Sequence, residues 1–482
     1  ALIDVLDDED EQVRMEATRA LGTCGTELAI PSLIPLLHDQ SVLVRTAAAM
    51  TLSMAKNPAA IPALLDAVKD TDWHVRARAI MSLAAIVRLD PAKQVQVTDV
   101  FISKLQEDEF ALVRDRAADA LAQVGDDRSI EALVRAVVSD NRDARFHAAR
   151  ALVTGKSVKA LPRLAAHAKH EDPEVRLKVV EVMGALGGEA QLGTVVEAVE
   201  DTDSNVRLAA VAALRRLQQR SGTPALREKV SDPNPHVRAA SARAIGDLGD
   251  KEAVPQLIGL LRDPNGFVRG AAAEALGKIG DRSAVTPLLS VLAGEQTVSD
   301  AQLDQSLVIG TDATLLPEVL RQKRIEEKIQ VVQALGALRS PEAVDPIVEH
   351  GLKAEDAGLR AVSAVELGRI GDPRAVNPLE DAVRGYYAAA APTTEFEEGM
   401  IAGTVPESVR QMKEREARVR ASVAWALGEL GDPVTVETLT KAANDENSLV
   451  RDAAIEALAK INDRQERLAA RKRKPSVSSG NP

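Results

Sequence analysis

The sequence Asp-Pro-Asn-Gly-Phe-Val-Arg-Gly-Ala-Ala-Ala-Glu-Ala-Leu-Gly-Lys-Ile-Gly-Asp, residues 263–281, decides the fold because its pattern recurs along the chain. Each copy places an Asp six residues before an Arg, followed by Ala, Leu and Gly. We use this marker arginine to set the register, and the copies are 31 residues apart wherever no extra residues intervene. Such a period is the signature of a repeat architecture. The markers are Arg14, Arg45, Arg76, Arg114, Arg145, Arg176, Arg207, Arg238, Arg269, Lys328, Arg360, Arg420 and Arg451.

Each copy has the pattern of two helices joined by a turn. The first helix, as in residues 253–261, has a Pro near its start, where a missing N–H costs nothing. The second begins at Val-Arg and ends at Leu-Gly, and Gly249, Gly280, Gly371 and Gly431 stand where a helix ends on a left-handed residue. The Asp after each of these glycines can cap the next helix.

The second helix carries apolar residues 1 before and 3, 6, 7 and 10 after the marker, which is one face at helical period. No single unit can bury this face alone, so neighbouring units must stack. The pattern predicts an all-α fold, an α-solenoid of about 14 helix pairs over residues 1–461 with a 31-residue period. Extra residues follow Asp90, and residues 309–312 are interpreted as part of a degenerate copy.

These residues resemble the HEAT repeat, in the short bacterial form known from phycobilisome lyase subunits. The resemblance covers residues 1–461. It implies a superhelix whose second helices line a concave groove. We expect the protein to act as an interaction scaffold or adaptor in the cytoplasm. The same repeat class includes lyase subunits, a base-excision glycosylase type and an iron hydroxylase, so the fold does not select the function.

The column of Asp and Arg residues allows two interpretations. It could bind an anionic ligand, or the Asp could cap a helix and pair with an Arg of its own or the next unit. A binding site has no reason to recur at every turn of a scaffold, so we expect a structural ladder. Its acids are Asp8, Asp39, Asp70, Asp108, Asp201, Asp232, Asp263 and Asp445.

Composition excludes several function classes. The 482 residues carry a net charge of −12, which disfavours general binding to a phosphate backbone. The single Cys24 excludes an internal disulfide framework. No stretch of 18 apolar residues could span a membrane. The chain begins without Met inside a helical pattern, so we expect a segment to precede Ala1.

Catalytic signatures are missing from the sequence. His167 and His170, followed by Glu171 and Asp172, offer two metal ligands, whereas a catalytic zinc site needs three protein ligands. We therefore expect no metal, no cofactor and no catalysis, and a scaffold that binds another protein. The alternatives are a subunit of a bilin lyase-like enzyme and a solenoid that binds nucleic acid or another polyanion.

The main partner site is predicted in the last third of the chain. The positions 1, 2, 5 and 9 after each marker point away from the buried face, and there Val362, Val365 and Trp425 replace the usual polar or small residues. An insertion at 385–413, between the two helices of one unit, carries aromatic residues of the kind that interfaces use. It is a contact loop, a lid or a disordered segment. Its aromatic residues are Tyr386, Tyr387 and Phe396.

A secondary site is predicted where basic residues occupy the same outward positions in the third to sixth units. These five side chains could bind an acidic protein segment despite the negative total charge. Residues 462–482, which include the run Arg471-Lys472-Arg473-Lys474, are predicted to form a disordered basic tail. The basic patch comprises Arg78, Arg116, His147, Arg150 and Lys178.

Overall fold

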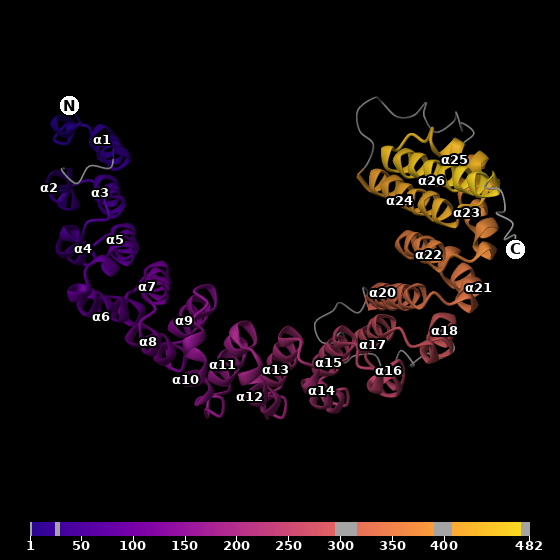
Figure 1. Cartoon of the computed structure of the whole chain (residues 1–482), viewed down its shortest axis with the longest axis horizontal. Helices are drawn as coiled ribbons and strands as arrows, with labels where there is room; N and C mark the ends of the chain where they lie inside the picture. Colours follow the sequence, from indigo (N-terminus) through magenta and orange to yellow (C-terminus); the bar gives the residue numbers. More distant parts are fainter. Residues whose placement is uncertain (1, 25–28, 295–315, 390–406, 474–482) are drawn as a thin grey trace, which may run out of the picture. The chain divides into compact units, whose positions relative to one another are not determined.

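The computed structural model describes residues 2–24, 29–294, 316–389 and 407–473, and every regular element in these ranges is helical (Figure 1). The chain divides into two compact units, residues 1–222 and 223–482. Each unit repeats one motif, a short first helix followed by a longer second helix. The predicted all-α solenoid is confirmed.

The first helices of the repeats are short or begin with a 3-10 turn. They are η1 (Ile3–Val5), α2 (Ile30–Leu33) with η3 (Pro35–His38), α4 (Ile61–Ala67), α6 (Pro91–Glu107), α8 (Asp127–Val137), α10 (Leu161–Ala165), α12 (Leu192–Ala198), α14 (Thr223–Lys229), α16 (Val254–Leu260), α18 (Val285–Ala293), α21 (Val344–Ile347) with the π-helix η13 (Val348–Leu352), α23 (Val376–Ala389) and α25 (Val436–Ala442).

The second helices carry the marker arginines. They are α1 (Glu11–Cys24), α3 (Val42–Met54), α5 (Trp73–Ile86), α7 (Ala111–Val124), α9 (Arg142–Thr154), α11 (Pro173–Leu186), α13 (Ser204–Leu217), α15 (Pro235–Leu248), α17 (Gly266–Ile279), α20 (Leu316–Ala337), α22 (Ala357–Ile370), α24 (Glu407–Leu430) and α26 (Ser448–Arg473).

Short 3-10 turns connect one repeat to the next, and their caps are the ones predicted. Gly249, Gly280, Gly371 and Gly431 have φ of 66°, 78°, 76° and 67°. The Asp that follows each glycine accepts a hydrogen bond from the backbone N–H two residues on. The turns are η4 (Pro58–Ala60), η5 (Val87–Leu89), η6 (Val158–Ala160), η7 (Glu189–Gln191), η8 (Arg220–Gly222), η9 (Lys251–Ala253), η10 (Arg282–Ala284), η12 (Pro341–Ala343), η14 (Pro373–Ala375) and η15 (Pro433–Thr435).

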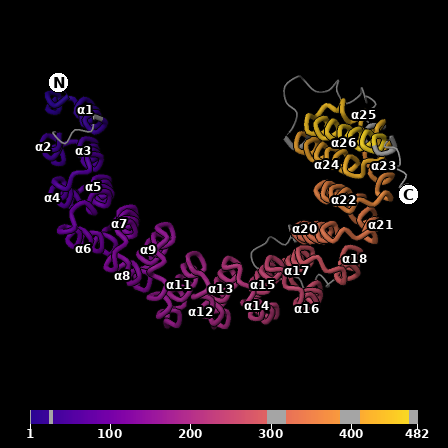
Figure 2. Tube along the Cα trace, in the orientation of Figure 1, coloured from indigo at the N-terminus to yellow at the C-terminus, as the bar shows by residue number. Residues whose placement is uncertain are grey.

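Within each unit the helices form two layers, one of first helices and one of second helices (Figure 2). Inside a unit, successive second helices pack on one another, as α1 on α3 in the first unit and α22 on α24 in the second. The predicted apolar positions form the core between layers, and Val268, Ala272 and Leu276 of α17 are fully buried. The outward face of the second-helix layer is thus the surface that the array leaves free.

Small residues set the spacing between successive second helices. A Cβ added to Gly246 would lie 2.6 Å from Ala275 Cα, and one on Gly277 would lie 2.8 Å from Ala334 Cα. The glycine stands 8 residues after its marker and the alanine 6 residues after the next. This pairing of Gly with Ala recurs at several joints and allows the backbones to approach closely.

Extra residues are accommodated in or between the helices of a repeat. Those after Asp90 lengthen the first helix α6, which Asp90 caps through Ala92 N–H. The expectation of a degenerate copy at 309–312 is corrected, because α17 packs directly on α20, the next second helix. Residues 309–312 themselves lie outside the described residues.

The predicted insertion and tail are partly helical. Residues 385–389 continue α23 and residues 407–413 begin α24, so the two helices of this repeat flank the insertion as expected. The tail differs from the prediction between residues 462 and 473, because α26 continues to Arg473. No helix in the described ranges is long and apolar enough to cross a membrane.

Candidate functional site

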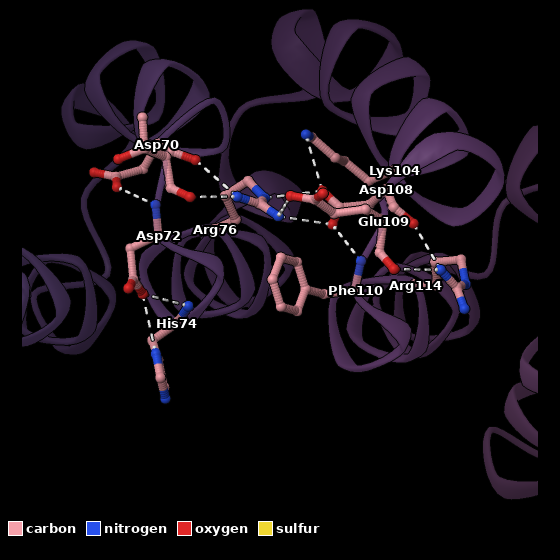
Figure 3. A network of polar contacts seen from close by, with 10 residues as sticks. Asp70, Asp72, His74, Arg76, Lys104, Asp108, Glu109, Phe110 and Arg114 are labelled. Carbon is pink, nitrogen blue, oxygen red and sulfur yellow. Dashed lines mark hydrogen bonds and ion pairs between the residues drawn. The ribbon is translucent and has the colours of Figure 1, made fainter.

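The marker arginines form a ladder between repeats, which Figure 3 shows at Arg76. Its Nε and Nη2 donate to the two carboxylate oxygens of Asp108 in the next repeat, both at 2.9 Å. Its Nη1 donates to the carbonyl oxygens of Asp70 and Thr71 in its own repeat, at 2.9 and 3.0 Å. Arg76 therefore ties the turn before its own helix to the turn of the next repeat.

The same geometry recurs along both units and confirms the structural interpretation of the Asp and Arg column. The acids also accept a backbone N–H two residues on, as Asp39 does from Ser41 at 2.8 Å. All these groups are engaged in fixing turns and are not available to an anionic ligand. Further rungs, in which the Arg and the Asp are 25 residues apart, are Arg14–Asp39, Arg45–Asp70, Arg176–Asp201, Arg238–Asp263 and Arg420–Asp445.

Four rungs use acids that the sequence pattern does not include. Arg114 and Arg145 bind Asp143 and Asp172, because Ser139 and His170 occupy the expected Asp positions. Arg269 binds Glu327 at 2.6 Å, and Arg360 binds Glu416. These two glutamates lie on α20 and α24, whose N-terminal extensions replace the usual turn.

Three carboxylates of the ladder have a lowered pKa, which favours their ionised form. Burial alone would raise the pKa of Asp108, but the hydrogen bonds from Arg76 and from Phe110 N–H outweigh this effect, and the pKa is lowered. The pKa of Asp39 and of Asp201 is lowered by the same balance, with Arg14 and Arg176 as the donors. The ladder is a structural charge network.

The structure brings three members of the predicted basic patch together on α7 and α9. Arg150 Nη2 contacts Asp115 and Asp119, both at 2.7 Å, and His147 Nδ1 lies 2.8 Å from Asp115. Arg116 pairs with Asp119 at 3.4 Å. The two aspartates, which the prediction overlooked, offset most of the positive charge.

The other two members of the basic patch lie apart from this network. Lys178 Nζ contacts Glu181 at 2.7 Å on the same helix, α11. Arg78 on α5 is half-buried, and within the described residues it forms no ion pair. The positive surface is therefore weaker than the sequence suggests, and Arg78 is where it is least compensated.

The predicted apolar residues Val362, Val365 and Trp425 lie half-buried on the adjacent helices α22 and α24. Gly368 makes room for the indole, since a Cβ there would lie 3.2 Å from Trp425 Cζ3. Lys460 of α26 covers the ring, with Nζ 5.9 Å from its centroid. The three second helices thus form one surface, which we call the α22–α24 face.

Charged pairs border this face. Lys460 contacts Glu429 and Glu456 at 2.8 and 2.7 Å. Arg369 Nη1 contacts Glu366 Oε1 at 2.9 Å. An apolar centre surrounded by polar groups is the usual anatomy of a protein interface.

The aromatic residues of the predicted insertion are only partly located. Tyr386 and Tyr387 belong to α23, and their side chains lie outside the described part of the structure. Phe396 lies outside the described residues altogether. The structure therefore places the α22–α24 face without placing the insertion on it.

Several aromatic residues lie on the surface although the sequence analysis did not select them. Phe110, Phe146 and Phe267 are 40%, 54% and 48% exposed, whereas Phe101 is fully buried. Trp73 stacks on Phe110 with ring centroids 5.9 Å apart. Their positions near helix starts, outside the buried register, are the signal that could have identified them.

The histidine pair does not form a metal site in the structure. His170 Nδ1 accepts the N–H of Asp172 at 3.1 Å and borders an open cavity of about 580 Å³ between α10 and α12. Lys169 and Glu197 at its rim pair at 2.9 Å. Among the described residues, no three His, Cys, Asp or Glu side chains are placed to hold a metal ion.

Solved structures of Kap121p and importin beta are similar to this chain. Kap121p matches with a TM-score of 0.61 and 12% identity, over 96% of this chain and 53% of that chain. Kap121p bound to Pho4p matches with a TM-score of 0.57 and 15% identity, over 96% and 57%. Importin beta matches with a TM-score of 0.49 and 13% identity, over 97% and 75%. The chain thus spans just over half the length of Kap121p, and the two Kap121p matches, at 12% and 15% identity, show a shared fold alone.

A search of the curated proteins found no match to this sequence. The family model for HEAT repeats matches residues 1–84, 98–171, 162–229, 223–302, 313–388 and 406–471. These matches do not distinguish the phycobilisome-lyase form from other HEAT repeats. They coincide with the stacked helix pairs of both units, and the chain belongs to the HEAT-repeat family.

Proposed function

We propose that this protein is a non-catalytic scaffold that binds a partner protein on its second-helix layer. The observation that carries the proposal is the α22–α24 face, where Val362, Val365 and Trp425 remain partly open to solvent. An array has no structural need for a tryptophan at an outward position, because its core is made of Ala, Val and Leu. Apolar patches with a polar border are typical of interaction surfaces.

Trp425 is the expected anchor of the bound partner. Tryptophan is enriched among residues whose loss weakens binding most, and such anchors lie at the centre of an interface. The ring lies against Gly368, and Lys460 Nζ stands over it. Little side-chain entropy is then lost when a partner covers the ring.

The test compares the only two tryptophans of the chain. A partner captured on the immobilised full chain is identified by mass spectrometry, and its affinity is measured for wild type, Trp425→Ala and Trp73→Ala. We expect Trp425→Ala to weaken binding by about 30-fold or more, the effect of losing an interface hot spot. Trp73→Ala, a matched change in the other unit, should leave the affinity unaltered. Equal affinities for all three proteins would refute the proposal.

We also propose that the insertion at 385–413 takes part in this site. Support comes from its place between α23 and α24, since α24 itself carries Trp425. Replacing residues 390–406 by a Gly-Ser linker should leave the helix content unchanged, as judged by circular dichroism. Partner affinity should fall if the insertion is a contact and rise if it is a lid, whereas an unchanged affinity would remove it from the site.

The basic patch is proposed as a secondary site for an acidic protein segment, centred on Arg78. The support is that Arg78 keeps its charge uncompensated, while Arg116 and Arg150 share Asp119. Binding there should weaken with added salt, because half-exposed charges are screened. Salt-independent affinity would leave the patch without a role.

A further inference from the structure

Glu366 stands at a position where every other repeat has an uncharged residue, in most of them alanine. Six residues after the marker, the second helix closely approaches the preceding second helix. In α22 this position is a glutamate, one turn from Val362. The residues at the same position in the other repeats are Ala20, Thr51, Ser82, Ala120, Ala151, Val182, Ala213, Ala244, Ala275, Ala334, Ala426 and Ala457.

The glutamate is enclosed by the joint between α20 and α22. Glu366 is only 2% exposed, and a Cβ on Gly336 of α20 would overlap its Oε2 atom. Oε1 accepts a hydrogen bond from Arg369 at 2.9 Å, whereas Oε2 has no hydrogen-bond partner among the described residues. A buried carboxylate with one unpaired oxygen is costly in its charged form.

The surroundings of Glu366 favour its neutral form. Burial raises the pKa of Glu366, and Arg369 of the same helix opposes this shift only in part. From α20 it faces the backbone of Gly336, and no charged group of α20 or α24 in the described ranges contributes to the shift. The charge of Arg369 itself lies largely in solvent, since its side chain is 57% exposed.

We propose that the joint between α20 and α22 is a pH-sensitive joint of the second unit, tight when Glu366 is protonated and loosened when it is ionised. The neighbouring joints, built from Gly and Ala, have no such group. This proposal is independent of partner binding, because it concerns the packing of two helices of the scaffold. Its consequence is that flexibility within the unit is concentrated at one place.

The direction of the effect follows from the raised pKa. A group whose pKa is higher in the folded state contributes stability that is fully present below its unfolded pKa and is lost as pH rises through its folded pKa. The joint should therefore open more readily at pH 7 than at pH 4. Asp39 and Asp108 of the ladder have lowered pKa values and act in the opposite direction, so the test must compare variants at each pH.

The experiment is amide hydrogen exchange of the full chain, read at α20 and α22 for wild type, Glu366→Ala, Glu366→Gln and Glu446→Gln. Alanine is the residue of the neighbouring repeats, and glutamine keeps the size of the side chain without its charge. Glu446 is exposed, so Glu446→Gln changes the net charge equally without touching the joint. Rates are corrected for the intrinsic effect of pH on exchange.

At pH 7, both Glu366 variants should open less often than wild type, by about tenfold for each unit by which the folded pKa is raised. At pH 4 the difference should disappear, and Glu446→Gln should match wild type at both pH values. Equal exchange of wild type and Glu366→Gln at pH 7 would overturn the proposal. A difference that persists at pH 4 would overturn it as well, because ionisation would not be its cause.

Discussion

At the scale of the residue, the ladder shows how one side chain joins two repeats. The side chains of Arg76 and Asp108 are 6% and 2% exposed, so each charged group is solvated almost entirely by its partner and not by water. Arg76→Ala would leave Asp108 buried with Lys104 as its remaining basic partner. We expect a loss of about 3–5 kcal/mol in unfolding free energy, the usual cost of breaking a buried ion pair.

The control for Arg76→Ala is Arg135→Ala, which removes an exposed pair with Glu131 at 3.1 Å. Exposed pairs contribute about 0–1 kcal/mol, so this variant should unfold close to wild type in urea. If the two variants lose similar amounts of unfolding free energy, the buried Arg76–Asp108 pair contributes no more to stability than an exposed pair.

Sequence alone identified the arginines because their spacing is regular. Sequence alone could not identify Glu327 and Glu416 as partners of the ladder arginines. These two acids lie on α20 and α24, whose N-terminal extensions replace the turn that carries the Asp in other repeats.

At the scale of the element, the close joints predict a steric effect. Gly277→Ala adds a Cβ that would lie 2.8 Å from Ala334 Cα, so α17 and α20 must move apart. Overpacking of this kind costs about 1–3 kcal/mol. Thermal unfolding followed by circular dichroism should show a lower transition temperature for the second unit.

Gly259 provides the matched control for Gly277. It lies within α16, and a Cβ there would meet no atom within 4 Å. Gly259→Ala should stabilise the protein by about 0.5–1 kcal/mol, because alanine loses less entropy than glycine in a helix. If Gly277→Ala and Gly259→Ala change the stability equally, the role of Gly277 is not to allow α17 and α20 to approach closely.

The helices themselves could be predicted because their signals are local. Proline at the start, glycine at the end and Asp at the cap all act within a few residues, and each recurs. The direct contact of α17 with α20 could not be predicted, since it depends on residues far apart in sequence. The pairing of Arg150 with Asp115 has the same origin, because it joins two neighbouring repeats.

At the scale of the molecule, the proposed function rests on a surface that recurs from repeat to repeat but is not uniform. Most outward positions of the second helices carry charged pairs or small residues, as the network of Asp115 and Arg150 does. The α22–α24 face departs from this pattern, with Trp425 at its centre. The sequence located this face because the repeat register shows which positions point outward. The sequence could not locate Phe396, because this residue belongs to the insertion and has no equivalent in the other repeats.

The most direct test of partner binding at this face uses Trp425 as its own reporter. In a Trp73→Phe variant, Trp425 is the only tryptophan of the chain, so its fluorescence reports on the α22–α24 face alone. Adding the captured partner, itself made without tryptophan, should shift the emission to shorter wavelength and protect the ring from acrylamide quenching, because binding removes water from the indole. If the partner binds with full affinity while emission and quenching stay unchanged, the partner site lies elsewhere on the protein.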